Sequence, residues 1–268
     1  MYKKIVALSL ITSCLIAANT EDVKDEIKET KAKIAKLKAN LKELQSTLPK
    51  EDYVFNARAE IGYVSNSGNT DTESFNADTK ITNSWDLHSL ELSMLMQYGT
   101  EDGKENKNRF LGELLYDYKL SKLLSLNYLV GYKDDKFSGF DYQFYTGPGA
   151  KYLAIKTDFH DLTLDGNLLY AKDKIFGEQE RKYYGYRLKG VYNMQVLENL
   201  KFHQTLSYRS EFSDFGNYFA YSKTAFTTRL SEIFSTGVAY HIDYTNQPAL
   251  IGKTSTDKMF TFNLIADY

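Results

Sequence analysis

The spacing of hydrophobic residues along this chain changes once, close to Pro49. Before Pro49, apolar side chains recur at steps of three and four residues, which is the period of an amphipathic helix. From Tyr53 to the C-terminus, apolar and polar side chains alternate, which is the period of a strand with two different faces. The chain is therefore predicted to hold a short N-terminal helix followed by a large all-β body.

The alternating part divides into twelve segments, each about 10 to 13 residues long. That is about the length of a tilted membrane-spanning strand and exceeds the usual strand of a soluble sheet. The segments are 53–65, 72–84, 88–99, 107–119, 124–134, 142–154, 160–171, 182–193, 199–211, 218–230, 233–244 and 258–268. The connections alternate between short ones and longer polar ones, such as 100–106. This predicts an antiparallel β-barrel of about twelve strands over 51–268, with turns at one end and loops at the other.

Two closed architectures share this alternation but have opposite polarity. A soluble lipocalin-like barrel turns its apolar residues inward, and an outer-membrane barrel turns them toward lipid. Aromatic residues bracket the apolar faces, as Tyr53 with Tyr63 and Phe110 with Tyr118, and aromatic girdles mark the two membrane interfaces. We therefore expect a transmembrane barrel in contact with the lipid bilayer, in the outer membrane of a Gram-negative bacterium.

The final strand ends on Tyr268, within the sequence MFTFNLIADY. An aromatic residue at the end of the last strand is a feature that we associate with recognition by the outer-membrane barrel assembly machinery. We expect Tyr268 to serve as that signal. The mean hydropathy is low, at −0.45, because only every second strand residue would meet lipid.

Residues 19–50 are predicted to form a stem in the periplasm, built as a coiled coil. Its seam is Val23, Ile27, Ile34, Leu37, Leu41, Leu44 and Leu48. Mainly Lys, Glu and Ala lie between these positions, which is the a/d pattern of a coiled coil. We expect the stem to form a homo-oligomer. The alternative is a single amphipathic helix that packs on its own barrel or on a membrane surface.

Residues 1–18 have the pattern of a cleavable secretory signal, because Lys3 and Lys4 precede an apolar run that is too short to span a bilayer. A rival interpretation rests on Cys14, which ends a sequence similar to a bacterial lipoprotein box and would then be lipidated. Both interpretations take the protein out of the cytoplasm. The formal net charge of −2 does not indicate a nucleic-acid partner.

Two stretches resemble a known family. They are SGNTDTESFNADTKI (67–81) and YKDDKFSGFDYQFYTGPGAKY (132–152). Both are similar to the YdiY-like family of salt-induced outer-membrane proteins, which is filed as a domain of unknown function. The resemblance covers most of 56–268 and implies an outer-membrane barrel, without implying any catalytic or ligand-binding residue. The predicted stem lies outside it.

Charged residues of both signs share the register that faces the barrel lumen. As candidate lumen-lining charges we identify Arg58, Glu60, Glu91, Arg109, Glu113, Asp117, Asp165, Arg187, Lys189, Arg209, Arg229 and Asp243. The same register holds Asp78, Lys133, Lys151, Lys201, Lys223 and Glu211. A charge that faces into a barrel requires water or a partner, because isolating it at low dielectric is costly. These residues therefore form either a water-filled, charge-selective pore or a paired network that fills a narrow barrel.

The first hypothesis for function is a pore for small polar solutes, linked by the resemblance to salt or osmotic stress. The second is a non-conducting envelope protein whose stem oligomerises or tethers. A remote third is an outer-membrane lipase, since His203 with Ser207, or His241 with Ser235, could pair within the lumen. Such pairs would lie away from lipid and have no acidic partner. We therefore expect no enzymatic activity, no cofactor and no metal site.

Overall fold

The computed structural model describes residues 24–40, 53–68, 70–249 and 254–268. The chain divides into two units, Met1–Glu51 and Asp52–Tyr268. In the first unit, residues 24–40 form a helix. Ile27, Ile34 and Leu37 of the predicted seam are exposed on it, by 49%, 46% and 66%. The predicted signal segment 1–18 with Cys14, and the seam residues Val23, Leu41, Leu44 and Leu48, lie outside the described residues.

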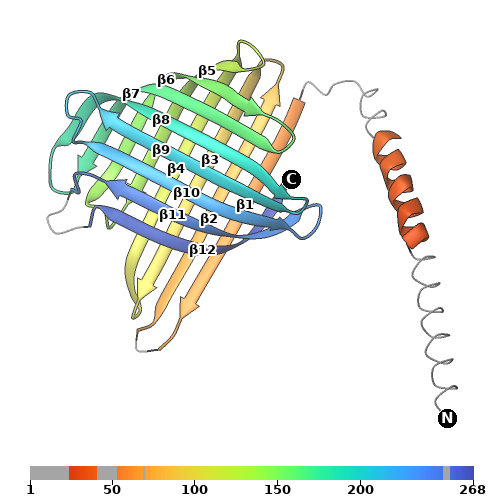
Figure 1. Cartoon of the computed structure of the whole chain (residues 1–268). Helices are drawn as coiled ribbons and strands as arrows, with labels where there is room; N and C mark the ends of the chain where they lie inside the picture. Colours follow the sequence, from red (N-terminus) through yellow and green to blue (C-terminus); the bar gives the residue numbers. More distant parts are fainter. Residues whose placement is uncertain (1–23, 41–52, 69, 250–253) are drawn as a thin grey trace. The chain divides into compact units, whose positions relative to one another are not determined.

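The second unit is a closed antiparallel barrel of twelve strands (Figure 1). The strands are β1 (Tyr53–Asn66), β2 (Thr72–Trp85), β3 (His88–Glu101), β4 (Lys104–Lys119), β5 (Leu124–Asp135), β6 (Phe140–Lys156), β7 (His160–Ile175), β8 (Glu180–Leu197), β9 (Leu200–Glu211), β10 (Tyr218–Arg229), β11 (Phe234–Thr245) and β12 (Thr256–Asp267). Each strand pairs with its neighbour in the sequence, and β1 pairs with β12 to close the barrel. The predicted fold class and strand number are confirmed.

The seam between β1 and β12 joins the two ends of the barrel. Arg58 lies opposite Asp267, and Gly62 lies opposite Asn263. The backbones of Ala57 and Tyr268 exchange two hydrogen bonds, of 2.8 and 2.7 Å. The C-terminus therefore lies beside the start of β1, at the end of the barrel that carries the short turns (Figure 1).

The prediction of one long loop is wrong. The connection predicted over 100–106 is a turn of two residues, because β3 continues to Glu101 and β4 begins at Lys104. Asp102 and Gly103 both have positive φ, of 49° and 72°, as a type I′ hairpin requires. The polar residues on both sides of this turn pair as strands.

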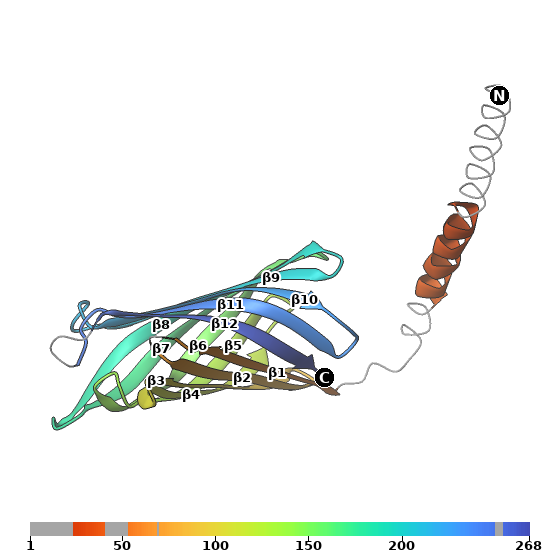
Figure 2. The same cartoon turned by 90° about the horizontal axis from the view of Figure 1, so that it is seen from below.

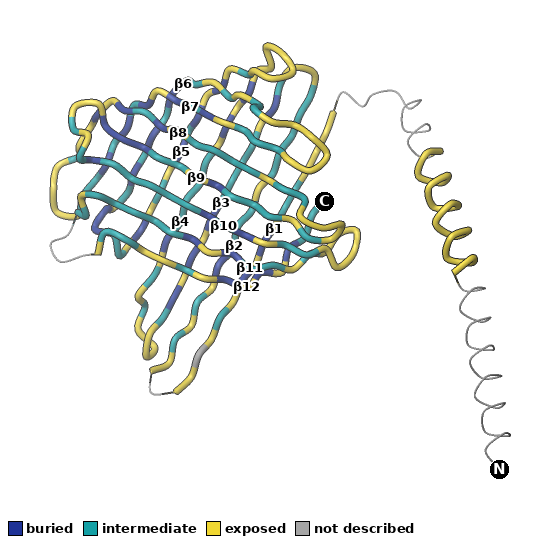
Figure 3. The backbone as a smooth tube through the Cα atoms, viewed as in Figure 1, coloured by how far each residue is buried: buried dark blue, intermediate teal, exposed yellow. Residues whose placement is uncertain are grey.

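Burial alternates along the strands, as the pattern predicts (Figure 3). The outward face of the barrel exposes large apolar side chains, among them Leu90, Met96, Leu114, Leu126, Tyr128, Leu164, Leu168, Leu188, Leu206, Phe226, Phe262 and Leu264. The inward face is mainly polar. In the turned view, β10 and β11 form the wall opposite β2–β4 (Figure 2).

Aromatic side chains on the outward face form two groups. Near the long-loop end, Tyr186, Tyr208, Tyr218 and Tyr244 contact one another in order across β8–β11, with ring centroids 6.0, 5.4 and 5.7 Å apart. Near the short-turn end, Trp85 stacks on His88, whose ring lies against Tyr116 and Tyr118. Tyr192, Phe202 and Phe226 also contact one another across β8–β10 near the short-turn end, so that on these strands aromatic rings bracket the apolar face at both ends.

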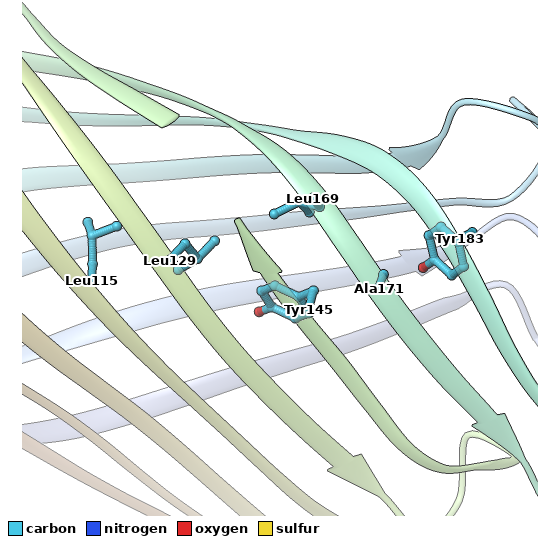
Figure 4. Close-up of a cluster of buried hydrophobic side chains, with 6 residues drawn as sticks. All are labelled: Leu115, Leu129, Tyr145, Leu169, Ala171 and Tyr183. Atoms are coloured by element: carbon cyan, nitrogen blue, oxygen red, sulfur yellow. The ribbon is translucent and has the colours of Figure 1, made fainter. Parts of the chain in front are cut away.

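One part of the inner wall is apolar, which the alternation did not predict. Leu115, Leu129, Tyr145, Leu169, Ala171 and Tyr183 form a buried cluster. They follow one another across β4–β8 (Figure 4). This cluster covers one side of the inner wall, and charged residues lie at its edges, where Tyr145 donates to Glu113 and Tyr183 donates to Asp173.

Candidate functional site

The lumen holds a cavity of about 630 Å³. Its lining includes Lys156 and Asp161 at the short-turn end and Thr245 near the long-loop end. Ten basic and seven acidic side chains line it, which gives a net charge of +3 with the histidines neutral. The cavity is therefore polar and carries an excess of positive charge.

A bidentate ion pair crosses the lumen between β4 and β11. The Nη1 atom of Arg109 lies 2.5 Å from Oδ2 of Asp243, and its Nη2 atom lies 2.7 Å from Oδ1. Arg109 is 4% exposed. Paired, parallel hydrogen bonds of this kind combine charge attraction with a fixed geometry. This pair, here called the lumen bridge, links two strands that are not neighbours in the wall.

A second group of charges lies beside the closing seam of the barrel. Lys223 on β10 reaches Glu60 on β1 at 3.0 Å and Asp78 on β2 at 2.7 Å. Arg58 contacts Glu60 at 2.9 Å and Asp267 on β12 at 2.9 Å. Lys223 therefore holds two carboxylates that belong to strands outside its own hairpins, and the group ties β10, β1, β2 and β12 together.

A third group is centred on Glu113 of β4. The hydroxyl group of Tyr145 donates to Glu113 at 2.6 Å. Arg187 lies 3.3 Å and Lys189 3.7 Å from the same carboxylate. One half-buried carboxylate thus faces two cations and a phenol across the lumen, between β4, β6 and β8.

Nine of the twelve predicted lumen charges line the cavity: Arg58, Glu60, Glu91, Arg109, Glu113, Arg187, Lys189, Arg209 and Asp243. The other three do not. Asp117 and Asp165 are buried on the inner wall, where Asp117 pairs with Lys151 at 2.5 Å and Asp165 accepts from Asn127 at 3.3 Å. Arg229 is exposed at the last residue of β10.

Several lining residues were not among the predictions. Lys80 shares the inward register with Asp78, so the alternation alone could have identified it. Tyr145, Phe219 and Tyr221 also line the cavity, but their aromatic side chains resemble the outward set in sequence. Asp161 shares the inward register of Asp165 on β7, so the alternation could have identified it as well. Lys156 follows a register shift in β6 that the sequence does not indicate.

The two lumen histidines bond to groups other than the serines considered above. Nδ1 of His203 lies 2.6 Å from Oδ1 of Asn193, and Nε2 lies 3.0 Å from the Thr205 hydroxyl. The hydroxyl of Tyr221 lies 3.0 Å from Nδ1 of His241. Over the described ranges, no group of three or more His, Cys, Asp or Glu residues could hold a metal ion. No helix in the described part of the chain is long and apolar enough to cross a membrane.

A family model described as "Protein of unknown function, DUF481" matches residues 59–268. Both stretches that carry the resemblance lie within this range. A search of curated proteins gave no match.

Several solved structures resemble the chain in fold, including the following three. The translocator domain of the autotransporter NalP from Neisseria meningitidis is 10% identical, with a TM-score of 0.44, covering 90% of this chain and 97% of that one. The KdgM porin is 12% identical, with a TM-score of 0.41 and coverages of 80% and 98%. The COG4313 outer membrane channel from Pseudomonas putida F1 is 10% identical, with a TM-score of 0.46 and coverages of 82% and 98%. Likenesses at this level carry no weight for function.

Proposed function

The chain belongs to the DUF481 family, whose function is unknown, and from that premise we propose that it is an outer-membrane barrel that conducts small polar solutes, with a preference for anions. The observation that carries the proposal is the charge-lined cavity of about 630 Å³ inside a closed barrel. Three parts of the protein bear on the proposal: the outward face of the barrel, the lumen and the helical stem.

The outward face supports a membrane location. In hydrocarbon, every backbone N–H and C=O group requires an internal partner, so a stranded protein must close on itself there. This barrel is closed, and its twelve strands are 12 to 18 residues long. Its outward face is apolar between two bands of aromatic rings, which is typical of the girdles at the two interfaces. A soluble barrel would expose its polar face to water instead.

The lumen supports passage of polar solutes. Fixed charges of both signs line the cavity, and the excess is positive. Charged linings select solutes by the sign of their charge. An anion that enters this cavity would meet more cations than carboxylates, so the expected preference is for anions.

A second candidate function is supported by the lumen bridge and by the contacts of Lys223. Both connect opposite parts of the wall through the interior, and a lumen crossed by ion pairs could be a rigid plug. The protein would then be a structural component of the envelope. We favour the pore because the bridged lumen still encloses a cavity that extends toward both ends.

The helical stem is proposed to lie in the periplasm and to self-associate. An even number of strands puts both barrel ends on the short-turn side, which faces the periplasm in outer-membrane barrels. Ile27, Ile34 and Leu37 are exposed on the helix. In a coiled coil, a partner helix packs against apolar residues at such positions. Cleavage of residues 1–18, assembly through Tyr268 and a role in salt or osmotic stress are part of the same proposal.

Liposome swelling tests the choice between pore and plug. The folded protein, without residues 1–18, would be reconstituted into vesicles that are then diluted into isotonic solutions of uncharged sugars of increasing size. The pore predicts swelling with the smallest sugars and a size limit above them. The plug predicts no swelling from protein shown to be folded and inserted.

A further inference from the structure

Two buried arginines face each other on adjacent strands of the inner wall. Arg187 on β8 and Arg209 on β9 are direct partners in the antiparallel ladder, and both line the cavity. They are 4% and 7% exposed. Like charges that lie directly opposite each other in a sheet are destabilising. A compensating anion is therefore expected at this position.

The protein's own carboxylates balance the positive charge of Arg187 only in part. Its Nη1 and Nη2 atoms lie 3.3 and 3.4 Å from the two oxygens of Glu113, which is long for a charge-assisted hydrogen bond. Glu113 also accepts a hydrogen bond of 2.6 Å from Tyr145. Within the described residues, Nε and Nη1 of Arg187 have no hydrogen-bond partner.

Arg209 is held by rings rather than by a carboxylate. Its guanidinium carbon lies 4.6 Å from the ring centroid of Tyr145 and 4.4 Å from that of Phe219. Asp173, its nearest acid, is 3.9 Å away and already accepts from Gln143 at 3.2 Å and Tyr183 at 2.8 Å. Nη1 of Arg209 has no hydrogen-bond partner among the described residues.

Stacking between two rings fixes the plane of a guanidinium group while leaving its edge free to donate. Buried N–H groups without acceptors carry a desolvation cost that a guest acceptor would relieve. Both arginines line the cavity, but these N–H atoms have almost no exposed surface of their own, so a guest acceptor requires a small turn of the two side chains toward the lumen. The guest must carry at least two oxygen atoms that can accept parallel hydrogen bonds, as carboxylates and phosphates do.

We propose that Arg187 and Arg209 form a binding subsite for a small oxyanion, a carboxylate or a phosphate, inside the lumen. The subsite rests on the proposed function, because it specifies which anions the pore would take up. Tyr145 positions both arginines, since its ring carries Arg209 and its hydroxyl holds the carboxylate that faces Arg187. The like-charged pair thus serves to attract an anion that the protein does not itself supply.

Equilibrium binding to the folded protein in detergent tests the subsite without requiring current. Isothermal titration calorimetry would use inorganic phosphate in one series and succinate in the other. The variants are Arg187→Gln and Arg209→Gln. Lys201→Gln is the matched control, because it removes one positive charge from the same cavity and, like Arg209, lies on β9. Heat-modifiable mobility in gels would establish that each barrel is folded.

We expect at least one anion to bind wild type and Lys201→Gln with equal affinity and to bind each arginine variant at least tenfold more weakly. Phosphate binding alone would identify a phosphate-bearing solute, and succinate binding alone a carboxylate. Absence of binding of both anions, or an affinity unchanged in both arginine variants, would overturn the subsite. Binding in a protein that conducts no ions would refute the pore and leave the subsite standing.

Discussion

Arg109 and Asp243 face each other across the barrel and form a bidentate ion pair of 2.5 and 2.7 Å, although they are separated by 134 residues in the sequence. The bridge crosses the lumen from β4 to β11. It therefore contributes to the stability of the barrel and limits the width of any path through it.

Replacement of Arg109 by Gln should widen the path and weaken the barrel. Loss of one partner leaves Asp243 without its compensating charge, which costs about 3 kcal/mol in a buried pair. Single-channel conductance should rise, and the free energy of unfolding in urea should fall. The double variant with Asp243→Asn should recover part of the stability and keep the higher conductance. A conductance equal to wild type in both variants would show that the bridge does not lie in the path.

Replacement of Glu113 by Gln should make the lumen more selective for anions. The change raises the net charge of the cavity lining from the +3 counted above to +4. The reversal potential in a salt gradient should shift further toward the equilibrium potential of the anion, and the barrel should still assemble. Glu101→Gln, at the tip of the exposed β3–β4 hairpin, is the control and should leave the reversal potential unchanged.

An arginine on the outward face should be costly. Leu114 is exposed on β4 and pairs with Leu92 on β3. Leu114→Arg should lower the free energy of unfolding in bilayers by about 2–4 kcal/mol if this level is the midplane. Leu120→Arg, at the β4–β5 turn, should cost at most about 1 kcal/mol near the interface. Equal, small effects in the two variants would argue for a soluble barrel.

Gly147 should not tolerate a side chain. A Cβ atom there would lie 1.8 Å from the carbonyl oxygen of Leu168, whereas at Gly166 the nearest atom would be 3.7 Å away. Gly147→Ala should therefore force β6 and β7 apart and cost more than about 3 kcal/mol. Gly166→Ala should assemble normally. The yield of heat-modifiable, folded barrel compares the two directly.

Proline at position 37 should break the stem and leave the barrel folded. Leu37 lies inside the helix of residues 24–40, where proline costs about 3 kcal/mol. If the stem self-associates, sedimentation of the detergent-solubilised variant should give a monomer, and Lys38→Ala should stay oligomeric. Oligomers that persist in the Leu37→Pro protein would move the contact to the barrel wall.

The alternation along the chain predicted the twelve strands because each residue of a strand faces one of two environments. It identified Arg109 and Asp243 as inward residues for the same reason. It could not predict that the two meet, since contact across a lumen depends on the shear and curvature of the whole barrel. The apolar cluster around Leu129 and Tyr145 was not predicted. Its residues share the inward, mainly polar register, and nothing in the neighbouring sequence indicates that they pack together.

The most direct test is the current through single proteins in planar bilayers, recorded across a salt gradient. Protein without residues 1–18, shown to be folded and inserted, should give steady ohmic steps with a reversal potential of the sign for anions. Steps with a cation-selective reversal potential would contradict the expected preference. Silence from inserted protein would contradict the pore itself and favour a closed, structural barrel.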